Sequence, residues 1–265
     1  MSLIEDHFRL THSPFPQTAD GLALLNHQPL REAIDRLRFA VDRDAIALFT
    51  AEAGTGKSTA LGCFARALDP TTHLVVYSAL TSLGPFSLLA SLASKLGLRP
   101  RRFKGETAQE LIAHLRGTAK RAIVIFDEAH LLPDASLEDL RLLTGESLER
   151  RSPFALILAG QPLLRERLVE PQHYALAQRI AVRITLRALT DSDVALFLDK
   201  HLRAAGATRN LFDPDAVTLL FQHSRGVPRI LQNLALAALM AAAAGSKKLV
   251  DADSIQQALL EQEVP

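Results

Sequence analysis

The chain has 265 residues and a formal net charge of +1, with 48% hydrophobic and 22% charged residues, a composition typical of folded globular proteins that excludes general disorder. A nearly neutral chain does not attract nucleic acid as a whole, so any nucleic-acid binding has to come from local basic clusters. The single cysteine, Cys63, excludes an internal disulfide and indicates a reducing, cytoplasmic location.

Residues 1–27 are expected to form an irregular N-terminal strap, because Pro14 and Pro16 disfavour helix at and before their own positions. Pro29 then begins an apolar-periodic stretch that predicts a helix. The short apolar run 45–50 follows and is typical of a parallel strand that is covered on both faces. An α/β domain is therefore expected over 28–188.

A glycine-bearing loop follows the run 45–50 and opens a helix. It matches the P-loop pattern except at Ala51, which stands where the pattern has glycine. In this context, backbone N–H groups and the helix dipole bind phosphate, Lys57 neutralises phosphate charge, and the Ser58 hydroxyl ligates Mg²⁺. The alternative is a glycine turn that caps a helix. The predicted nucleotide-binding residues of the loop are Glu52, Ala53, Gly54, Thr55, Gly56, Lys57, Ser58 and Thr59.

Further apolar strands and helices alternate after the loop. Strands are predicted over 74–77, 122–126, 154–158 and 181–186, and helices over 84–96, 107–119 and 135–146. This alternation predicts an α/β domain with a mostly parallel sheet flanked by helices.

A basic cluster with an aromatic residue lies between two of these helices. It contains Arg101, Arg102, Phe103 and Lys104. Basic side chains on an exposed loop can bind phosphates of DNA, although such a run can also be a solvated turn.

Two carboxylates, Asp127 and Glu128, follow the predicted strand 122–126. An acid at the carboxyl end of a parallel strand faces the edge where open α/β sheets bind ligands. Asp127 is expected to hold Mg²⁺ together with Ser58, and Glu128 to orient and activate the attacking water. A solvated helix start is the alternative for two adjacent acids.

Gln161 and Arg229 are candidates for contact with the γ phosphate. Gln161 follows the strand 154–158, where its amide could touch the phosphate or the attacking water, or cap the helix at Pro162. Arg229 begins a predicted helix, where the dipole disfavours a cation, which favours a role in phosphate binding.

Arg179 precedes the last predicted strand and could enter the site of a neighbouring subunit as an arginine finger. Arg183 and Arg187 compete for this role, and a solvated surface position is the alternative for each of the three.

The last part of the chain, 189–265, is expected to form a small all-helical lid domain. Its helices are predicted over 191–205, 213–223, 228–244 and 251–263, each beginning at a capping residue or proline. The apolar run 234–244 is too short to span a bilayer, so no membrane segment is expected.

These motifs resemble the AAA+ ATPases that include the ExeA/GspA secretion ATPase and the TniB/TnsC-type transposition ATPases. The resemblance covers nearly the whole chain, and its ordered matches are 7–10, 14–15, 53–59, 127–130, 140–144, 158–162, 176–180 and 226–230.

The resemblance implies roles for residues that spacing leaves open. Gln161 is similar to the sensor-1 position, Arg179 to the arginine finger and Arg229 to sensor 2, so the catalytic set is Glu128, Lys57, Gln161 and Arg179. The family implies ATP with Mg²⁺, and a homo-oligomer that is a ring or helical filament. Two residues depart from the family pattern. Ala51 stands where the first glycine is usual, and Gly145 stands where the relatives often carry asparagine.

The transposition branch is the leading hypothesis for the function. Its members assemble on duplex DNA with ATP and recruit a transposase, and they often stop after the lid, as this chain does. The alternative is a soluble ATPase similar to ExeA/GspA that assists the assembly of a secretion system. A third hypothesis is a nucleotide-gated switch with little turnover.

Overall fold

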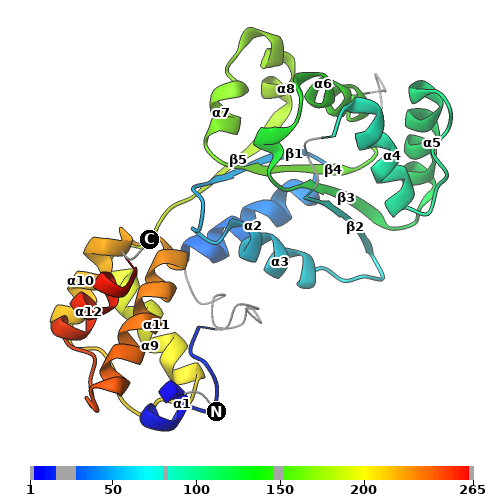
Figure 1. Cartoon of the computed structure of the whole chain (residues 1–265). Helices are drawn as coiled ribbons and strands as arrows, with labels where there is room; N and C mark the ends of the chain where they lie inside the picture. The colour runs from blue at the N-terminus through cyan, green and yellow to red at the C-terminus, as the bar shows by residue number, and fades with distance from the viewer. Residues whose placement is uncertain (1–2, 16–27, 80–82, 146–151, 263–265) are drawn as a thin grey trace. The chain divides into compact units, whose positions relative to one another are not determined.

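A computed structural model describes residues 3–15, 28–79, 83–145 and 152–262 of the chain (Figure 1). The chain divides into two compact units. The first contains Met1–Leu30, Gly54–Gly56 and Arg187–Pro265, and the second contains Arg31–Ala53 and Lys57–Leu186.

A parallel five-stranded sheet forms the centre of the second unit. Its strands lie in the order β2-β3-β4-β1-β5, and every neighbouring pair is parallel. The strands are β1 (Ile46–Ala51), β2 (His73–Ser78), β3 (Arg121–Phe126), β4 (Ala155–Gly160) and β5 (Ile180–Leu186). Every residue of β1 and β4 is buried, which explains their continuous apolar sequences, whereas buried and exposed residues alternate along the edge strand β5.

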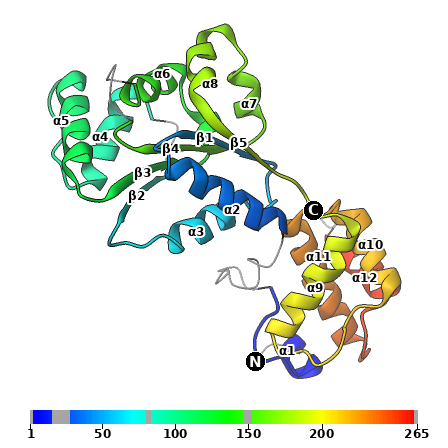
Figure 2. The same cartoon turned by 180° about the vertical axis from the view of Figure 1, so that it is seen from behind.

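Helices cover both faces of this sheet. Figures 1 and 2 show α2 (Gln28–Val41) and α3 (Lys57–Arg66) on one face. The other face carries α4 (Pro85–Lys95), α5 (Lys104–Gly117), α6 (Asp134–Leu143), α7 (Leu163–Arg167) and α8 (Tyr174–Arg179). On that face Leu48, Val124 and Leu156 pack in one core cluster with leucines of α4, α5 and α6. The predicted α/β fold with a parallel sheet flanked by helices is confirmed.

The start of α5 differs from the prediction. The helix begins at Lys104 rather than at 107, so Lys104 belongs to a helix and not to a basic loop. Phe103 is extended and forms the N-cap, and Glu106 lies in the first turn, where its charge suits the helix dipole. The hydroxyl of Thr107 donates to the Phe103 carbonyl at 3.3 Å.

Several short elements of the second unit have no counterpart in the sequence prediction. They are α8 and the 3₁₀ turns η2 (Ala129–Leu131) and η3 (Pro171–His173), whereas α7 follows the helix start expected at Pro162. Each spans two turns or fewer, so a hydrophobic period cannot show in its sequence. One of them, η2, directly follows the predicted acids of β3.

The first unit is helical. It contains α9 (Asp191–Ala204), α10 (Pro214–Ser224), α11 (Pro228–Ala244) and α12 (Ala252–Gln262). One isolated parallel bridge joins Phe212 to Val250. In the described part of the chain, no helix combines the length and the apolar character that crossing a membrane requires.

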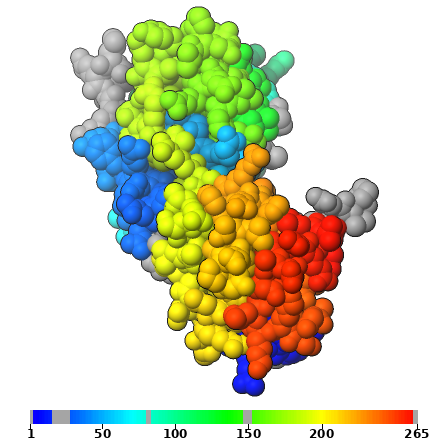
Figure 3. Space-filling view, turned by 90° about the vertical axis from the view of Figure 1, so that its left-hand side faces the viewer, coloured from blue at the N-terminus to red at the C-terminus, as the bar shows by residue number. Residues whose placement is uncertain are grey.

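The expectation of an irregular strap over 1–27 is wrong for its first residues. Leu3–Phe8 form a helix, α1, whose Ile4 and Phe8 are buried, and this helix contacts α11 (Figure 3). Ile4 and Phe8 stand four residues apart on one helix face, which allows both to enter the same core. The expected strap also includes 1–2 and 16–27, which lie outside the described residues.

Candidate nucleotide site

Three side chains from two elements, α3 and β2, meet at Asp127, directly after β3. The Lys57 ammonium at the start of α3 donates to Oδ1 of Asp127, the Ser58 hydroxyl donates to Oδ2 at 3.1 Å, and the Tyr77 hydroxyl of β2 donates to Oδ2 at 3.0 Å. Asp127 is 3% exposed and Lys57 is 6% exposed, so this is a buried ion pair. The structure thus brings together the predicted Lys57, Ser58 and Asp127, and it adds Tyr77.

The electrostatics of this cluster keep Asp127 charged. Burial by itself raises the pKa of the Asp127 carboxyl, but the hydrogen bond and charge of Lys57 outweigh burial and hold that pKa below its usual value. A charged carboxylate beside a hydroxyl offers two hard oxygen donors of the kind that Mg²⁺ prefers. Ser58 and Asp127 therefore fit the predicted Mg²⁺ ligands.

The backbone of the glycine loop explains its glycines. Gly54 has a φ of 81° and Gly56 a φ of 103°, in the left-handed region that only glycine adopts without strain. Ala51 ends β1 outside that region, so its methyl group is tolerated there. Of the other predicted loop residues, Thr55 is buried, Thr59 is half-buried, and Glu52 and Ala53 are exposed.

Glu128 occupies a strained position beside the buried pair. Its φ of 53° and ψ of 34° place a non-glycine residue in the left-handed region, at the N-cap of η2. One carboxylate oxygen, Oε1, lies 2.6 Å from the Lys57 ammonium, and the side chain is 36% exposed. A carboxylate that is bound at one oxygen and partly exposed to solvent can accept a proton from water.

Gln161 follows β4 and lies near the acids through His130. The backbone N–H of Gln161 donates to Nδ1 of His130 at 3.4 Å, and Nδ1 lies 3.5 Å from Oε2 of Glu128. The N-cap residue of α7 is Pro162 rather than Gln161. Sequence reasoning missed His130 as a site residue, although it ends the Asp127–His130 motif.

The competing arginines of the second unit are tied to backbone carbonyls. Arg179 donates to the carbonyl of Arg141 at 2.8 Å, and Arg183 donates to the carbonyls of Ala177 at 2.7 Å and Ile180 at 3.3 Å. Both are exposed. Arg187 and Arg229 belong to the first unit, so a role for either at Asp127 stays a prediction.

Gly145 leaves the space that the Arg179 guanidinium fills. A Cβ atom at this position would clash with Nη1 of Arg179. The departure from the asparagine of the relatives therefore has a local structural reason, since any side chain at position 145 displaces Arg179.

The predicted DNA-binding residues are mostly paired with acids. Arg101 donates to both carboxylate oxygens of Glu110, at 2.7 and 3.1 Å, and Lys104 lies 2.6 Å from Asp139. The Arg102 guanidinium lies 5.7 Å from the ring centre of Phe103. Two of the three candidate cations are thus neutralised within the chain.

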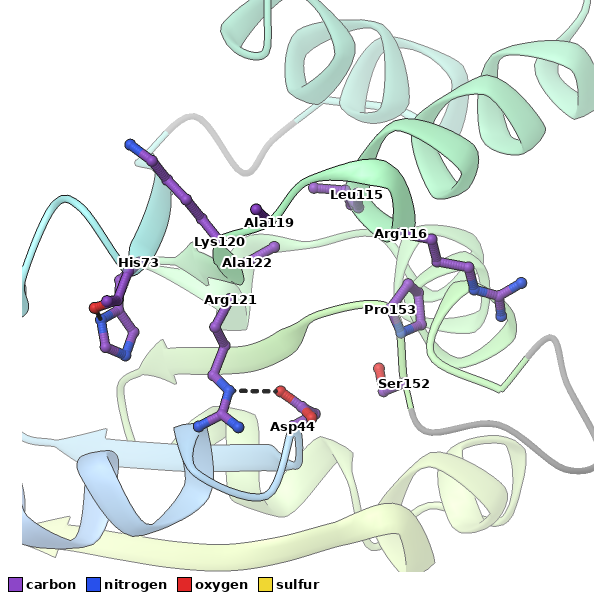
Figure 4. A pocket seen from close by; sticks show the side chains of 11 residues that line it. Asp44, His73, Leu115, Arg116, Ala119, Lys120, Arg121, Ala122, Ser152 and Pro153 are labelled. Atoms are coloured by element: carbon purple, nitrogen blue, oxygen red, sulfur yellow. Dashed lines mark hydrogen bonds and ion pairs between the residues drawn. The ribbon is translucent and has the colours of Figure 1, made fainter.

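A separate pocket lies at the opposite, amino-terminal edge of the sheet. It measures about 660 Å³ and is lined by the starts of β2 and β3 and by residues before β1 and β4. Arg121 pairs with Asp44 across it, and Figure 4 shows Lys120 and Arg116 extending in opposite directions. Its cations do not converge on one point, and it contains none of the predicted site residues.

Comparisons with known proteins agree with this geometry. Residues 41–168 match a family model described as an AAA domain. The chain is 34% identical over 255 residues to General secretion pathway protein A of Aeromonas hydrophila. The match covers 93% of this chain and 46% of the relative, so the chain spans about half the length of that protein.

Solved structures share the fold at low sequence identity. Cdc6p of Pyrobaculum aerophilum has a TM-score of 0.70 at 17% identity. The match covers 97% of this chain and 70% of Cdc6p. ORC1 of Aeropyrum pernix, solved in complex with DNA, has a TM-score of 0.64 at 20% identity. The match covers 89% of this chain and 64% of ORC1. The RuvB Holliday junction branch migration motor of Thermotoga maritima has a TM-score of 0.60 at 17% identity. The match covers 96% of this chain and 74% of RuvB. The chain thus carries the P-loop AAA+ fold.

Proposed function

We propose that Lys57, Asp127 and Glu128 form the centre of the site at which this chain hydrolyses ATP. The observation that carries the proposal is the buried Lys57 ammonium between two carboxylates at the carboxyl end of β3. Lys57 neutralises phosphate charge, and Glu128 takes the proton of the attacking water. Ser58 and Asp127 would hold Mg²⁺, which would neutralise charge on the phosphate oxygens. Gln161 orients the water.

Replacing Glu128 with glutamine tests this assignment. Glu128→Gln keeps the size of the side chain and removes its basicity, so turnover should fall by about 100-fold or more while ATP binding persists. Single-turnover hydrolysis and binding of a fluorescent ATP analogue measure the two effects. Glu166→Gln, an exposed carboxylate on α7, is the matched control. Wild-type turnover in Glu128→Gln would reject the proposed base.

The wider role that we propose is ATP-driven assembly of a partner complex, as a component similar to General secretion pathway protein A. The 34% identity over 93% of the chain supports this choice. In this proposal the chain acts in the cytoplasm as a homo-oligomer, a ring or helical filament, in which Arg179 or a competing arginine completes the site of a neighbouring copy. Arg179 has to leave its bond to the Arg141 carbonyl to do so.

A second candidate role is regulation of transposition on duplex DNA through a transposase. The exposed Arg102 beside the exposed Phe103 favours DNA contact, but the pairing of Arg101 and Lys104 with acids weakens the case. Fluorescence anisotropy with duplex DNA and an unhydrolysed ATP analogue separates the two roles. Binding that the triple change of Arg101, Arg102 and Lys104 to alanine abolishes favours the DNA role, and no binding at low salt rejects it.

A further inference from the structure

The imidazole of His130 stands between Glu128 and the end of β4. His130 is 8% exposed, and its Nδ1 is almost equidistant from two partners. The backbone nitrogen of Gln161 lies 3.4 Å away, and Oε2 of Glu128 lies 3.5 Å away. The same nitrogen therefore faces the proposed base and the proposed sensor.

Surrounding residues hold His130 in this position. Arg167 of α7 donates to the His130 carbonyl at 2.7 Å and also pairs with Asp134. His173 adds a contact of 3.0 Å to Asp134. Gly160 leaves room for the ring, because a Cβ there would lie 3.1 Å from the His130 backbone nitrogen and 3.3 Å from Nδ1. The backbone of His130 is thus held by α7, and its ring lies against the end of β4.

We propose that His130 is a positioning residue that couples the Glu128 carboxylate to Gln161 at the end of β4. This inference rests on the proposed function, since it gives His130 a task in ATP hydrolysis. When Nδ1 carries a lone pair, it accepts the hydrogen bond of the Gln161 N–H. When Nδ1 carries the hydrogen, it donates to Oε2 of Glu128.

One nitrogen cannot serve both partners at once, so a movement of Gln161 changes how Glu128 is held. Lys57 holds the carboxylate oxygen Oε1 at 2.6 Å, and His130 contacts the other oxygen, Oε2. In this arrangement, a movement of Gln161 on phosphate contact is transmitted to Glu128 through Nδ1 of His130.

Three substitutions of His130 test the proposal. His130→Asn keeps a polar amide near the place of Nδ1, His130→Gln moves the amide to the place of Nε2, and His130→Ala removes both. We expect kcat to fall about 10- to 100-fold in His130→Ala and His130→Gln, and His130→Asn to recover most of it. Kd for a fluorescent ATP analogue should stay within about twofold of wild type in all three, since the contacts of Nδ1 are to Glu128 and Gln161.

Gly160→Ala probes the same contact from the neighbouring strand. Its methyl group displaces His130 without altering any side chain of the proposed catalytic set, so it should lower kcat with unchanged Kd, as His130→Ala does. Thermal melting of all variants reports the effect of each change on folding. Because Gly160→Ala retains the imidazole side chain, it also tests the proposal if His130→Ala fails to fold.

Several outcomes would overturn the proposal. It fails if His130→Ala or Gly160→Ala turns over ATP at the wild-type rate, or if His130→Asn is as slow as His130→Ala. It also fails if the loss of kcat follows the loss of melting temperature across the variants, since His130 would then be structural. A wild-type chain that hydrolyses no ATP would instead refute the proposed function itself, which is a distinguishable result.

Discussion

At the level of single residues, the pairing of Lys57 with Asp127 determines which variants can be interpreted. Removing Lys57 leaves a buried carboxylate without its cation, a change that typically costs about 3–5 kcal/mol of stability. A Lys57 variant that fails to bind nucleotide therefore combines a lost phosphate contact with damage to folding. Glu128→Gln avoids this problem because it keeps the Lys57–Asp127 pair and the shape of the side chain.

Tyr77 should ionise at unusually high pH. Burial, followed by the negative charge and hydrogen bond of Asp127, raises the pKa of Tyr77 to about 12. The chain has two tyrosines, so Tyr174→Phe leaves Tyr77 as the reporter. With that pKa, about a tenth of Tyr77 is ionised at pH 11, against about nine tenths for an ordinary tyrosine. Ultraviolet difference absorbance measures the phenolate.

The sign of the effect on stability follows from the same shift. A pKa raised by folding contributes stability that is complete below pH 10 and is lost as the pH rises toward about 12. Adding Asp127→Asn removes one cause of the shift and should move the ionisation to lower pH. Ionisation mostly complete at pH 11, with native circular dichroism, would contradict the proposed environment of Tyr77.

At the level of the element, helix caps define where the C-terminal helices begin. Thr190 forms a capping box with Asp193, in which the Thr190 side chain accepts from the Asp193 N–H and the Asp193 carboxylate accepts from the Thr190 N–H. Asp213 caps α10 by accepting from the Ala216 N–H at 2.7 Å. These local bonds explain why the starts of both helices can be predicted from sequence.

Thr190→Ala should lower the free energy of unfolding by about 1 kcal/mol, because it removes a side-chain acceptor for the orphan N–H groups of α9. Urea unfolding followed by circular dichroism measures the loss. Gln256→Ala, an exposed change within α12, serves as the control and should have little effect. An equal effect of the two substitutions would show that the capping box adds nothing beyond an exposed surface contact.

Sequence patterns predicted the strands and long helices because these rest on local period and burial, as in the fully buried β1 and β4. The residues Lys57, Ser58 and Asp127 were predictable as a set because a strand end and a glycine loop both mark the same sheet edge. Tyr77 and His130 were not, since their contacts depend on side-chain directions in space. The pairing of Lys104 with Asp139 was hidden for the same reason, as the partners stand 35 positions apart.

At the level of the whole molecule, each unit has a hydrophobic core of its own. The core of the helical unit includes Phe8 and Phe15 from the N-terminal segment together with Phe197 of α9. The ring of Phe15 stacks on that of Phe197 with centres 6.4 Å apart. The core of the α/β unit includes Leu156 of β4, which is fully buried. The N-terminal segment thus stabilises helices that follow it by nearly two hundred residues.

Substitutions in the two cores should therefore have separable effects on local stability. Phe15→Ala removes a buried ring and should cost about 3–5 kcal/mol, and Leu156→Ala should cost about 2–5 kcal/mol, each with the cavity that it leaves. Hydrogen exchange read by mass spectrometry should show faster exchange in α9 for Phe15→Ala, with β4 nearly unchanged, and the reverse for Leu156→Ala. Leu142→Ala, at a side chain that is 52% exposed, is the control. Equal acceleration of α9 and β4 by either core variant would instead mean that the two units unfold as one cooperative body, and the N-terminal segment would then support the α/β unit as strongly as its own helices.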